Sequence, residues 1–214
     1  AKTVVASAPV ENKTSVEFKV EIPYTIKTDN KAEVITIGEH NLNATYEYHI
    51  RPRQEQAAFL IARITDWEKY KLISGNANLY LESTFVGKTY LNTKYVQDTL
   101  DFSLGKDQSV FVSRKRISTY TKTKIVGSDR VDSRAWELQV RNAKAKAIPV
   151  VMIDQVPISS NKEIKVEDVV FDGGTYDETT GYIQYKFVLK PKATMKYTFS
   201  YKVSFPNNYF LQVE

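Results

Sequence analysis

Apolar and polar residues alternate along most of this chain. Residues 16–22 read Val-Glu-Phe-Lys-Val-Glu-Ile, so apolar side chains occupy every second position. In an extended strand these side chains share one face while the charged ones share the other. The same alternation runs through 42–50 and through 195–205, where Pro206 ends it. This pattern predicts half-buried antiparallel strands.

Shorter apolar runs predict further strands between these three. The turn signals that separate them recur about every 8 to 12 residues, which is typical of sandwiches rather than of βαβ units. Ser83-Thr84 indicates a tight hairpin, and Asp172-Gly173-Gly174 supplies the positive φ angles that another turn needs. The further strands are expected at 33–37, 59–65, 77–82, 85–91, 99–104, 109–125, 134–142, 147–154, 162–170 and 181–190.

Residues 54–63 conflict with this all-β picture. They consist of good helix formers, and propensity alone predicts a helix. The apolar run 59–64 is too short to decide by periodicity. Pro52 and the boundary at 65–67 favour a buried strand instead, as does the family resemblance given below.

The best candidate for a domain boundary is Leu104-Gly105-Lys106-Asp107, a glycine-containing polar stretch between two apolar runs. We therefore predict an all-β chain of two consecutive antiparallel β-sandwich domains. Residues 1–14 would be a flexible or edge-pairing lead-in, 15–106 the first domain, and 107–214 a second, immunoglobulin-like sandwich.

Composition narrows the class of protein. Of the 214 residues, 42% are hydrophobic and none is cysteine, which excludes disulfides, thiolate metal sites and a thiol nucleophile. No window approaches the ~18 apolar residues that a spanning helix needs. The net charge of +5 gives a weak attraction to anionic surfaces. The chain lacks an initiator Met and a leader, so we expect a processed or recombinant piece of a longer protein.

Several stretches, in order along the chain, resemble the C-terminal domain of the mucoidy inhibitor A-like family, a domain of unknown function. They are 59–65, 72–80, 84–88, 102–110, 114–116, 140–142, 151–159, 164–166 and 199–206. One departure is Ser74, where the family commonly carries a proline before the glycine.

The resemblance implies a plan in which an N-terminal domain and a coiled coil precede this β-rich portion, often behind a secretion signal. The partners it implies are those upstream segments, with self-association as another option. It also implies an extracytoplasmic, periplasmic or cell-surface location. It carries over no catalytic residue.

The histidines and acidic residues give little catalytic signal. His40 and His49 have no ligand set around them, and His49 is expected to form a surface pair with Glu47. Asp154 lies in an apolar run, where accepting backbone N–H bonds near Pro157 is the economical role. An acidic set could offer oxygen ligands to Ca²⁺, although a solvated turn explains it better. The set comprises Glu167, Asp168, Asp172, Asp177 and Glu178.

Two groups of residues are candidates for ligand binding. Trp67 and Tyr70 could form an aromatic platform for a glycan, whereas Trp136 shares its parity with Leu138 and Val140 and is expected in the core. Along a single strand 109–125, basic residues of one parity would form a stripe able to meet a polyanion, or would instead pair with Glu137. The stripe consists of Arg114, Arg116, Lys122 and Lys124.

These observations predict a non-enzymatic structural or interaction module of a bacterial cell-envelope protein. An alternative is a module that binds glycan or acidic polysaccharide, and a lower alternative is a carboxylate-dependent hydrolase. We expect no cofactor and no metal, because the sequence has no glycine-rich phosphate loop and no ligand set. We also expect no nucleic-acid partner and no membrane span.

Overall fold

The computed structural model describes residues 9–12, 15–18, 36–37, 39–94 and 98–213. Nearly all regular structure in these residues is β, which confirms the all-β prediction. One 3₁₀ helix, η1 (Trp67–Tyr70), occurs among them, and no helix in this part of the chain could cross a membrane. The strands are β1 (Pro9–Asn12), β2 (Ser15–Phe18), β3 (Ala44–Arg51), β4 (Glu55–Thr65), β5 (Gly75–Leu81), β6 (Thr84–Leu91), β7 (Thr99–Arg116), β8 (Lys122–Val126), β9 (Asp129–Asn142), β10 (Ile148–Gln155), β11 (Lys165–Phe171), β12 (Thr175–Asp177), β13 (Tyr182–Leu189) and β14 (Thr194–Pro206).

The chain forms two compact units, which are interleaved in sequence. Unit 1 comprises Ala1–Thr45, Arg63–Asn78 and Lys88–Asp101, and unit 2 comprises Tyr46–Ala62, Leu79–Gly87 and Phe102–Glu214. Strands β3, β4, β5, β6 and β7 contribute residues to both. Unit 2 contains the larger core and the surfaces discussed below.

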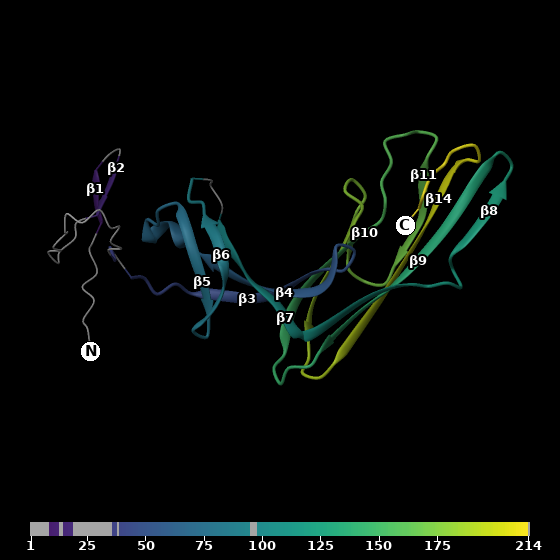
Figure 1. Cartoon of the computed structure of the whole chain (residues 1–214). Coiled ribbons are helices and arrows are strands. Elements are labelled where there is room, and N and C mark those ends of the chain that lie inside the picture. The colour runs from purple at the N-terminus through teal and green to yellow at the C-terminus, as the bar shows by residue number, and fades with distance from the viewer. Residues whose placement is uncertain (1–8, 13–14, 19–35, 38, 95–97, 214) are drawn as a thin grey trace, which may run out of the picture. The chain divides into compact units, whose positions relative to one another are not determined.

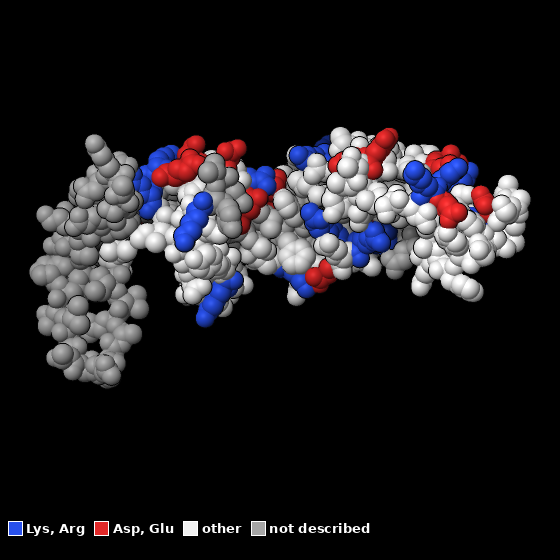
Figure 2. Space-filling view, turned by 90° about the horizontal axis from the view of Figure 1, so that it is seen from above, with Lys and Arg blue, Asp and Glu red and all other residues white. Residues whose placement is uncertain are grey.

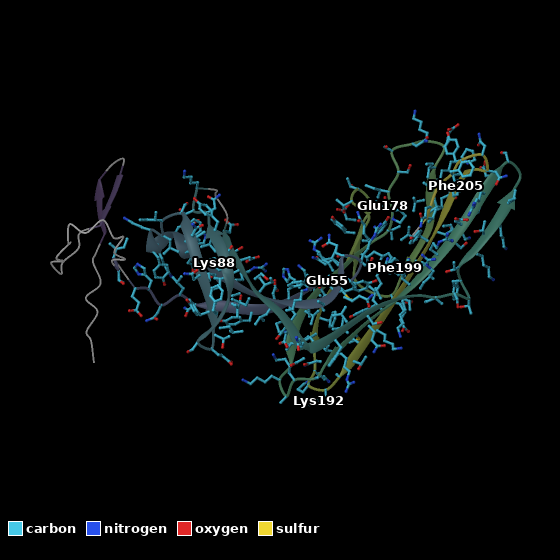
Figure 3. All side chains as sticks on the ribbon, viewed as in Figure 1. Glu55, Lys88, Glu178, Lys192, Phe199 and Phe205 are labelled. Carbon is cyan, nitrogen blue, oxygen red and sulfur yellow. The ribbon has the colours of Figure 1, made fainter. Side chains whose placement is uncertain are left out.

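Unit 2 is organised by one mixed sheet of strand order β11-β14-β9-β7-β4-β3-β10-β13-β12, with β8 added on β9. The long strands β9 and β14 run side by side, as Figure 1 shows, and pair antiparallel from Thr194↔Arg141 to Pro206↔Asp129. On the other side of the unit, β10 pairs antiparallel with β13 and parallel with β3. Figure 3 labels Phe199 and Phe205 on β14.

The core of unit 2 lies between parts of this sheet that face each other. On β14, Phe199, Tyr201, Val203 and Phe205 are buried and alternate with more exposed residues. Rings from β13 and β14, which are not paired strands, contact each other, because the Tyr185 and Tyr197 centroids lie 4.3 Å apart. Each such large apolar side chain contributes about 1.5 to 3 kcal/mol on burial. The alternation in the sequence therefore supplies the main stabilising term of this unit.

Most local predictions are confirmed, and some are wrong. Residues 55–65 form strand β4, so burial outweighs helix propensity there. The turn at 172–174 has positive φ at Gly173 and Gly174 as predicted. The β5–β6 turn instead lies at Glu82 and Ser83, both with positive φ, one residue earlier than expected. Residues 15–18 are strand, whereas 19–22 and 33–35 lie outside the described residues and 36–37 are not strand.

The single strand predicted at 109–125 is wrong, because β7 ends at Arg116 and a turn precedes β8. In the other direction, β7 runs unbroken through 104–107, so the polar stretch taken as a domain boundary is not a break in the strand. Residues 9–12 of the expected lead-in pair with β2. The division into two consecutive sandwiches, and the immunoglobulin-like character of the second, stay predictions.

Candidate functional site

The buried carboxylate of Asp154 is neutralised by Arg114. Its Oδ2 and Oδ1 accept hydrogen bonds from Nε and Nη2 of Arg114 at 2.9 and 3.3 Å, and the Gln155 N–H donates to Oδ1 at 2.8 Å. The Asp154 side chain is fully buried and that of Arg114 is one-tenth exposed. The backbone bond confirms the predicted structural role, whereas the sequence did not reveal Arg114 as the partner. With three accepted hydrogen bonds and full burial, the Asp154 carboxylate presents no oxygen to solvent.

Arg114 also stacks on the core. Its guanidinium carbon lies 3.5 Å from the centre of the Trp136 ring, at the distance of a close cation–π contact. Trp136 is 8% exposed, which confirms its predicted place in the core. Beside it, burial raises the pKa of the Tyr201 hydroxyl, while the nearby charge of Arg114 acts in the opposite direction. The phenol therefore stays neutral across the physiological range.

A second buried charge, Asp132, joins β8 and β9. Its carboxylate accepts hydrogen bonds from Thr123 at 2.7 Å, from Nε of Arg130 at 3.1 Å and from Nη2 of Arg134 at 3.0 Å. Arg134 in turn donates to the Val213 carbonyl at 3.2 Å. Burial alone would raise the pKa of Asp132, but these donors lower it below the ordinary value. The cluster therefore links β8, β9 and the segment around Val213 by hydrogen bonds.

Tyr48, Asp107 and Lys144 form a third polar cluster in unit 2. Tyr48 donates to Asp107 Oδ2 at 2.6 Å, and Lys144 donates to the same oxygen at 2.5 Å. Burial opposes ionisation of Asp107, yet the hydrogen bonds from Lys144, Tyr48 and the Ser109 N–H lower its pKa to about 2. The pKa of Lys144 is raised by its bond to Asp107. Because Lys144 stays protonated and Tyr48 neutral, neither is poised as a general base.

Asn142 is buried and saturated as well. Its amide nitrogen donates to the carbonyls of Lys146, Leu189 and Lys190 at 2.8 to 3.3 Å. Its side-chain oxygen accepts from the Lys144 N–H at 2.9 Å. Asn142 thus fixes the loops at the ends of β9 and β13.

The basic stripe predicted from 109–125 is not formed. Arg114 and Arg116 lie opposite Leu138 and Trp136 on the core face of β9. Lys122 and Lys124 lie opposite Ser133 and Val131, which have the other parity of β9. Cross-strand neighbours share a face, so the break at residues 117–121 places the two arginines and the two lysines on opposite faces. The predicted pairing with Glu137 is also wrong, because Glu137 bonds Lys196 at 3.1 Å.

The structure does not present Trp67 and Tyr70 as an open aromatic platform. Trp67 is only 5% exposed, so its face is not open to a sugar. The Tyr70 ring packs at 5.4 Å from the His40 ring, and its hydroxyl donates to the Asn41 carbonyl at 3.4 Å. The sequence could not show this, because one short 3₁₀ turn carries no periodicity from which burial can be inferred. The predicted pair of His49 and Glu47 does form, at 2.7 Å.

The acidic residues near the 172–174 turn do not gather into a metal site. Among the residues that the structure describes, no group of three or more His, Cys, Asp or Glu side chains is placed to hold an ion. Asp168 pairs with Lys202 at 2.6 Å, Asp177 accepts bonds from the Thr179 N–H and the Thr180 hydroxyl, and Asp172 is bonded by Thr198. These carboxylates therefore bond residues of their own turn or of the neighbouring strand β14.

One concave surface of unit 2 is a groove that we call the loop groove. It consists of two adjoining hollows, of about 400 and 720 Å³, that share Pro157, Ile158, Ser159, Ile164 and Val166 in their lining. The larger hollow is also bordered by Glu167, Asp168 and Glu178. Ile158 is 55% exposed. The groove therefore has a mixed polar and apolar lining around the exposed Ile158, with Arg53 in the smaller hollow and acidic residues, including the Glu178 labelled in Figure 3, in the larger one.

The fold and these surfaces define the class first: an all-β domain whose buried charged side chains are paired and whose surface carries an open groove of mixed lining. The chain belongs to the family described as "Domain of unknown function (DUF4139)", which it matches over residues 2–207. It is 25% identical over 190 residues to "Protein F37C4.5" of Caenorhabditis elegans, covering 85% of this chain and 33% of that protein. The chain thus spans about a third of that relative's length. No solved structure matches it significantly.

Proposed function

We propose that this domain is a non-catalytic interaction module that binds a protein segment in the loop groove. The observation that carries this proposal is the contrast between interior and surface. The charged and amide side chains buried in the described chain, Asp132, Arg134, Asn142 and Asp154, each have structural partners, although the Trp136 Nε1 and Tyr185 hydroxyl atoms are buried without one. The groove around Ile158, by contrast, leaves apolar surface in water. Concave surfaces that combine exposed apolar side chains with a few charged groups mark binding sites.

The charges around the groove favour one kind of partner. Glu167 and Glu178, in the larger hollow, make no ion pair with any residue that the structure describes, whereas Asp168 is already paired with Lys202. A segment with apolar side chains and a Lys or Arg near these carboxylates would fill the hollows and complement the charge. Upstream segments of the same longer protein are the first candidates, and a second copy of the protein is another.

Site-specific photo-crosslinking in the full-length protein tests this proposal. A benzophenone-bearing residue at Ile158 is expected to crosslink to a defined apolar and basic segment. The matched control is the same residue at Val188, which is 64% exposed on β13 and does not line the groove. Charge reversal by E167K and E178K should abolish the Ile158 crosslink. Equal products from both positions, or a crosslink that survives charge reversal, would contradict the proposal.

A second candidate function is glycan binding, at a site other than the predicted platform. A hollow of about 480 Å³ is lined by Ile117, Tyr120, Val170 and Asp172 and also by Ala135, Phe171, Thr198, Phe199 and Ser200, so its lining favours a neutral sugar over an acidic one. Tyr120 is 65% exposed, so its ring is available to stack on a sugar. Binding of a neutral glycan on an array that is lost in Tyr120→Ala would support this candidate. Unchanged binding by that variant would eliminate the site.

We also propose that the longer protein acts at the cell envelope, as the family resemblance implies. In the view of Figure 2, basic and acidic side chains are interspersed, so the net charge of +5 does not produce a single-sign face on that side. Charge there gives no preference for nucleic acid. Fractionation of cells that carry the full-length protein tests the proposal, and recovery in the cytosolic fraction alone would contradict it.

A further inference from the structure

Strand β8 has an open edge. It pairs with β9 from Lys122↔Ser133 to Val126↔Asp129, and no other described strand pairs with it. All five of its residues are exposed, including Ile125 at 66% and Val126 at 63%. The outward backbone N–H and C=O groups of an open edge can pair with an added strand.

The other free ends of the sheet are blunted by irregular or very short backbone, whereas β8 has regular backbone and carries two lysines, which disfavour a basic strand but not an acidic one. Strand β11 has an irregular register between Glu167 and Val170, with Asp168 at a φ of 52°. Strand β12 has only three residues. Strand β8 pairs without a bulge and contains no proline. It is therefore the free end whose regular backbone best suits another strand.

The side chains of β8 determine which residues an added strand needs in order to pair with it. Lys122 and Lys124 share one face, and neither forms an ion pair with any residue in the described part of the chain. A second copy pairing antiparallel about Lys124 would place lysine opposite lysine, which is destabilising. On the other face, Ile125 lies opposite Arg130 and is exposed. An acidic residue facing each lysine and an apolar residue beside Ile125 would complement the edge.

We propose that the edge of β8 accepts, by strand addition, an extended protein segment in which acidic and apolar residues alternate. The carboxylates pair with Lys122 and Lys124, while the apolar side chains cover Ile125. This site is separate from the loop groove, because none of the groove's lining residues belongs to β8. The proposal therefore does not depend on occupation of the groove.

The test is a peptide titration of the 214-residue chain followed by ¹H–¹⁵N NMR. The probe is acetyl-Gly-Glu-Val-Glu-Val-Glu-Val-Gly-amide. One control peptide has Lys in place of Glu, and another has N-methyl groups on all of its Glu and Val backbone nitrogens, which removes the donors from both edges. We expect shifts in the amides of 122–126 with the acidic peptide alone, and weaker binding at high salt. The variant K122E/K124E should lower the affinity for the acidic peptide at least about tenfold and admit the Lys peptide.

Three outcomes would overturn the proposal. Shifts centred on 156–166 would place the peptide in the loop groove instead. Equal binding of the N-methylated peptide would exclude backbone pairing. The binding would then be explained by attraction between its carboxylates and the two lysines, which a polyanion also provides. Shifts at 122–126 that depend on the concentration of the chain without peptide would identify a second copy as the occupant. The exposed positions of both lysines mean that the variant should fold, which its own NMR spectrum verifies.

Discussion

Removing the carboxylate of Asp154 should destabilise unit 2 strongly. Asp154→Ala leaves the guanidinium of Arg114, one-tenth exposed, without its counterion. Unit charges about 3.5 Å apart attract by about 5 kcal/mol at an effective dielectric constant of about 20. Breaking one partner of a buried pair costs about 3 to 5 kcal/mol in practice. We expect that loss for Asp154→Ala, and a smaller one for Asp154→Asn, which keeps the shape and one acceptor oxygen.

The assay is urea unfolding followed by tryptophan fluorescence. In a Trp67→Phe background the emission comes from Trp136, which Arg114 covers, so the signal reports unit 2. Arg114→Met keeps part of the packing on Trp136 while removing the charge, and the double variant closes a thermodynamic cycle. We expect a coupling free energy of about 2 kcal/mol or more. A loss below about 1 kcal/mol for Asp154→Ala, or additivity within about 0.5 kcal/mol, would refute the ion-pair argument.

Three more predictions concern the same fold. At Gly181 (φ 72°) a Cβ would lie 2.3 Å from the Val156 carbonyl oxygen. Gly181→Ala should therefore lower the free energy of unfolding several-fold more than Gly127→Ala, because Gly127 also has a positive φ but no neighbouring atom near its Cβ position. Equal losses of the two variants in urea unfolding would contradict this. The pKa of Asp107 is lowered from 3.8 to about 2, so its contribution of about 2 kcal/mol is present above pH 4 and is lost as the pH falls to 2. Unfolding measured from pH 5 to 2 should therefore be less pH-dependent in Asp107→Asn, and an unchanged slope would count against the cluster. Asn142→Leu leaves several carbonyls without a donor and should lower stability by about 2 kcal/mol or more, which thermal unfolding would show; a neutral result would mean that water replaces the amide.

Local pattern predicted the strands because strand periodicity is itself local. Alternation from Met195 to Phe205 fixes which side chains share a face, and β14 buries those of one parity. The break between β7 and β8 escaped prediction because Ser118, Thr119 and Tyr120 suit strands as well as turns, and no glycine or proline marks the place. One missed turn shifted the parity of Lys122 and Lys124 and so reversed the face assigned to them.

The buried polar residues show a second limit of prediction from the sequence. Parity along 148–156 indicates that Asp154 faces the core with Met152 and Val156. Its partner Arg114 lies 40 residues away in sequence, and only the strand order brings β7 and β10 together. A buried carboxylate in an apolar run signals that a cation must exist somewhere, yet it does not say which one. The same holds for Asp107 and Lys144, which are joined only by tertiary structure.

The central claim is that this domain acts through surfaces that its partners cover. Amide hydrogen exchange tests it most directly, when the full-length protein, isolated under mild conditions together with what it binds, is compared with the 214-residue chain alone. We predict slower exchange at residues 157–166, around the loop groove, in the isolated assembly, and unchanged exchange on β13 near Val188. Equal exchange at 157–166 in both samples would contradict the claim.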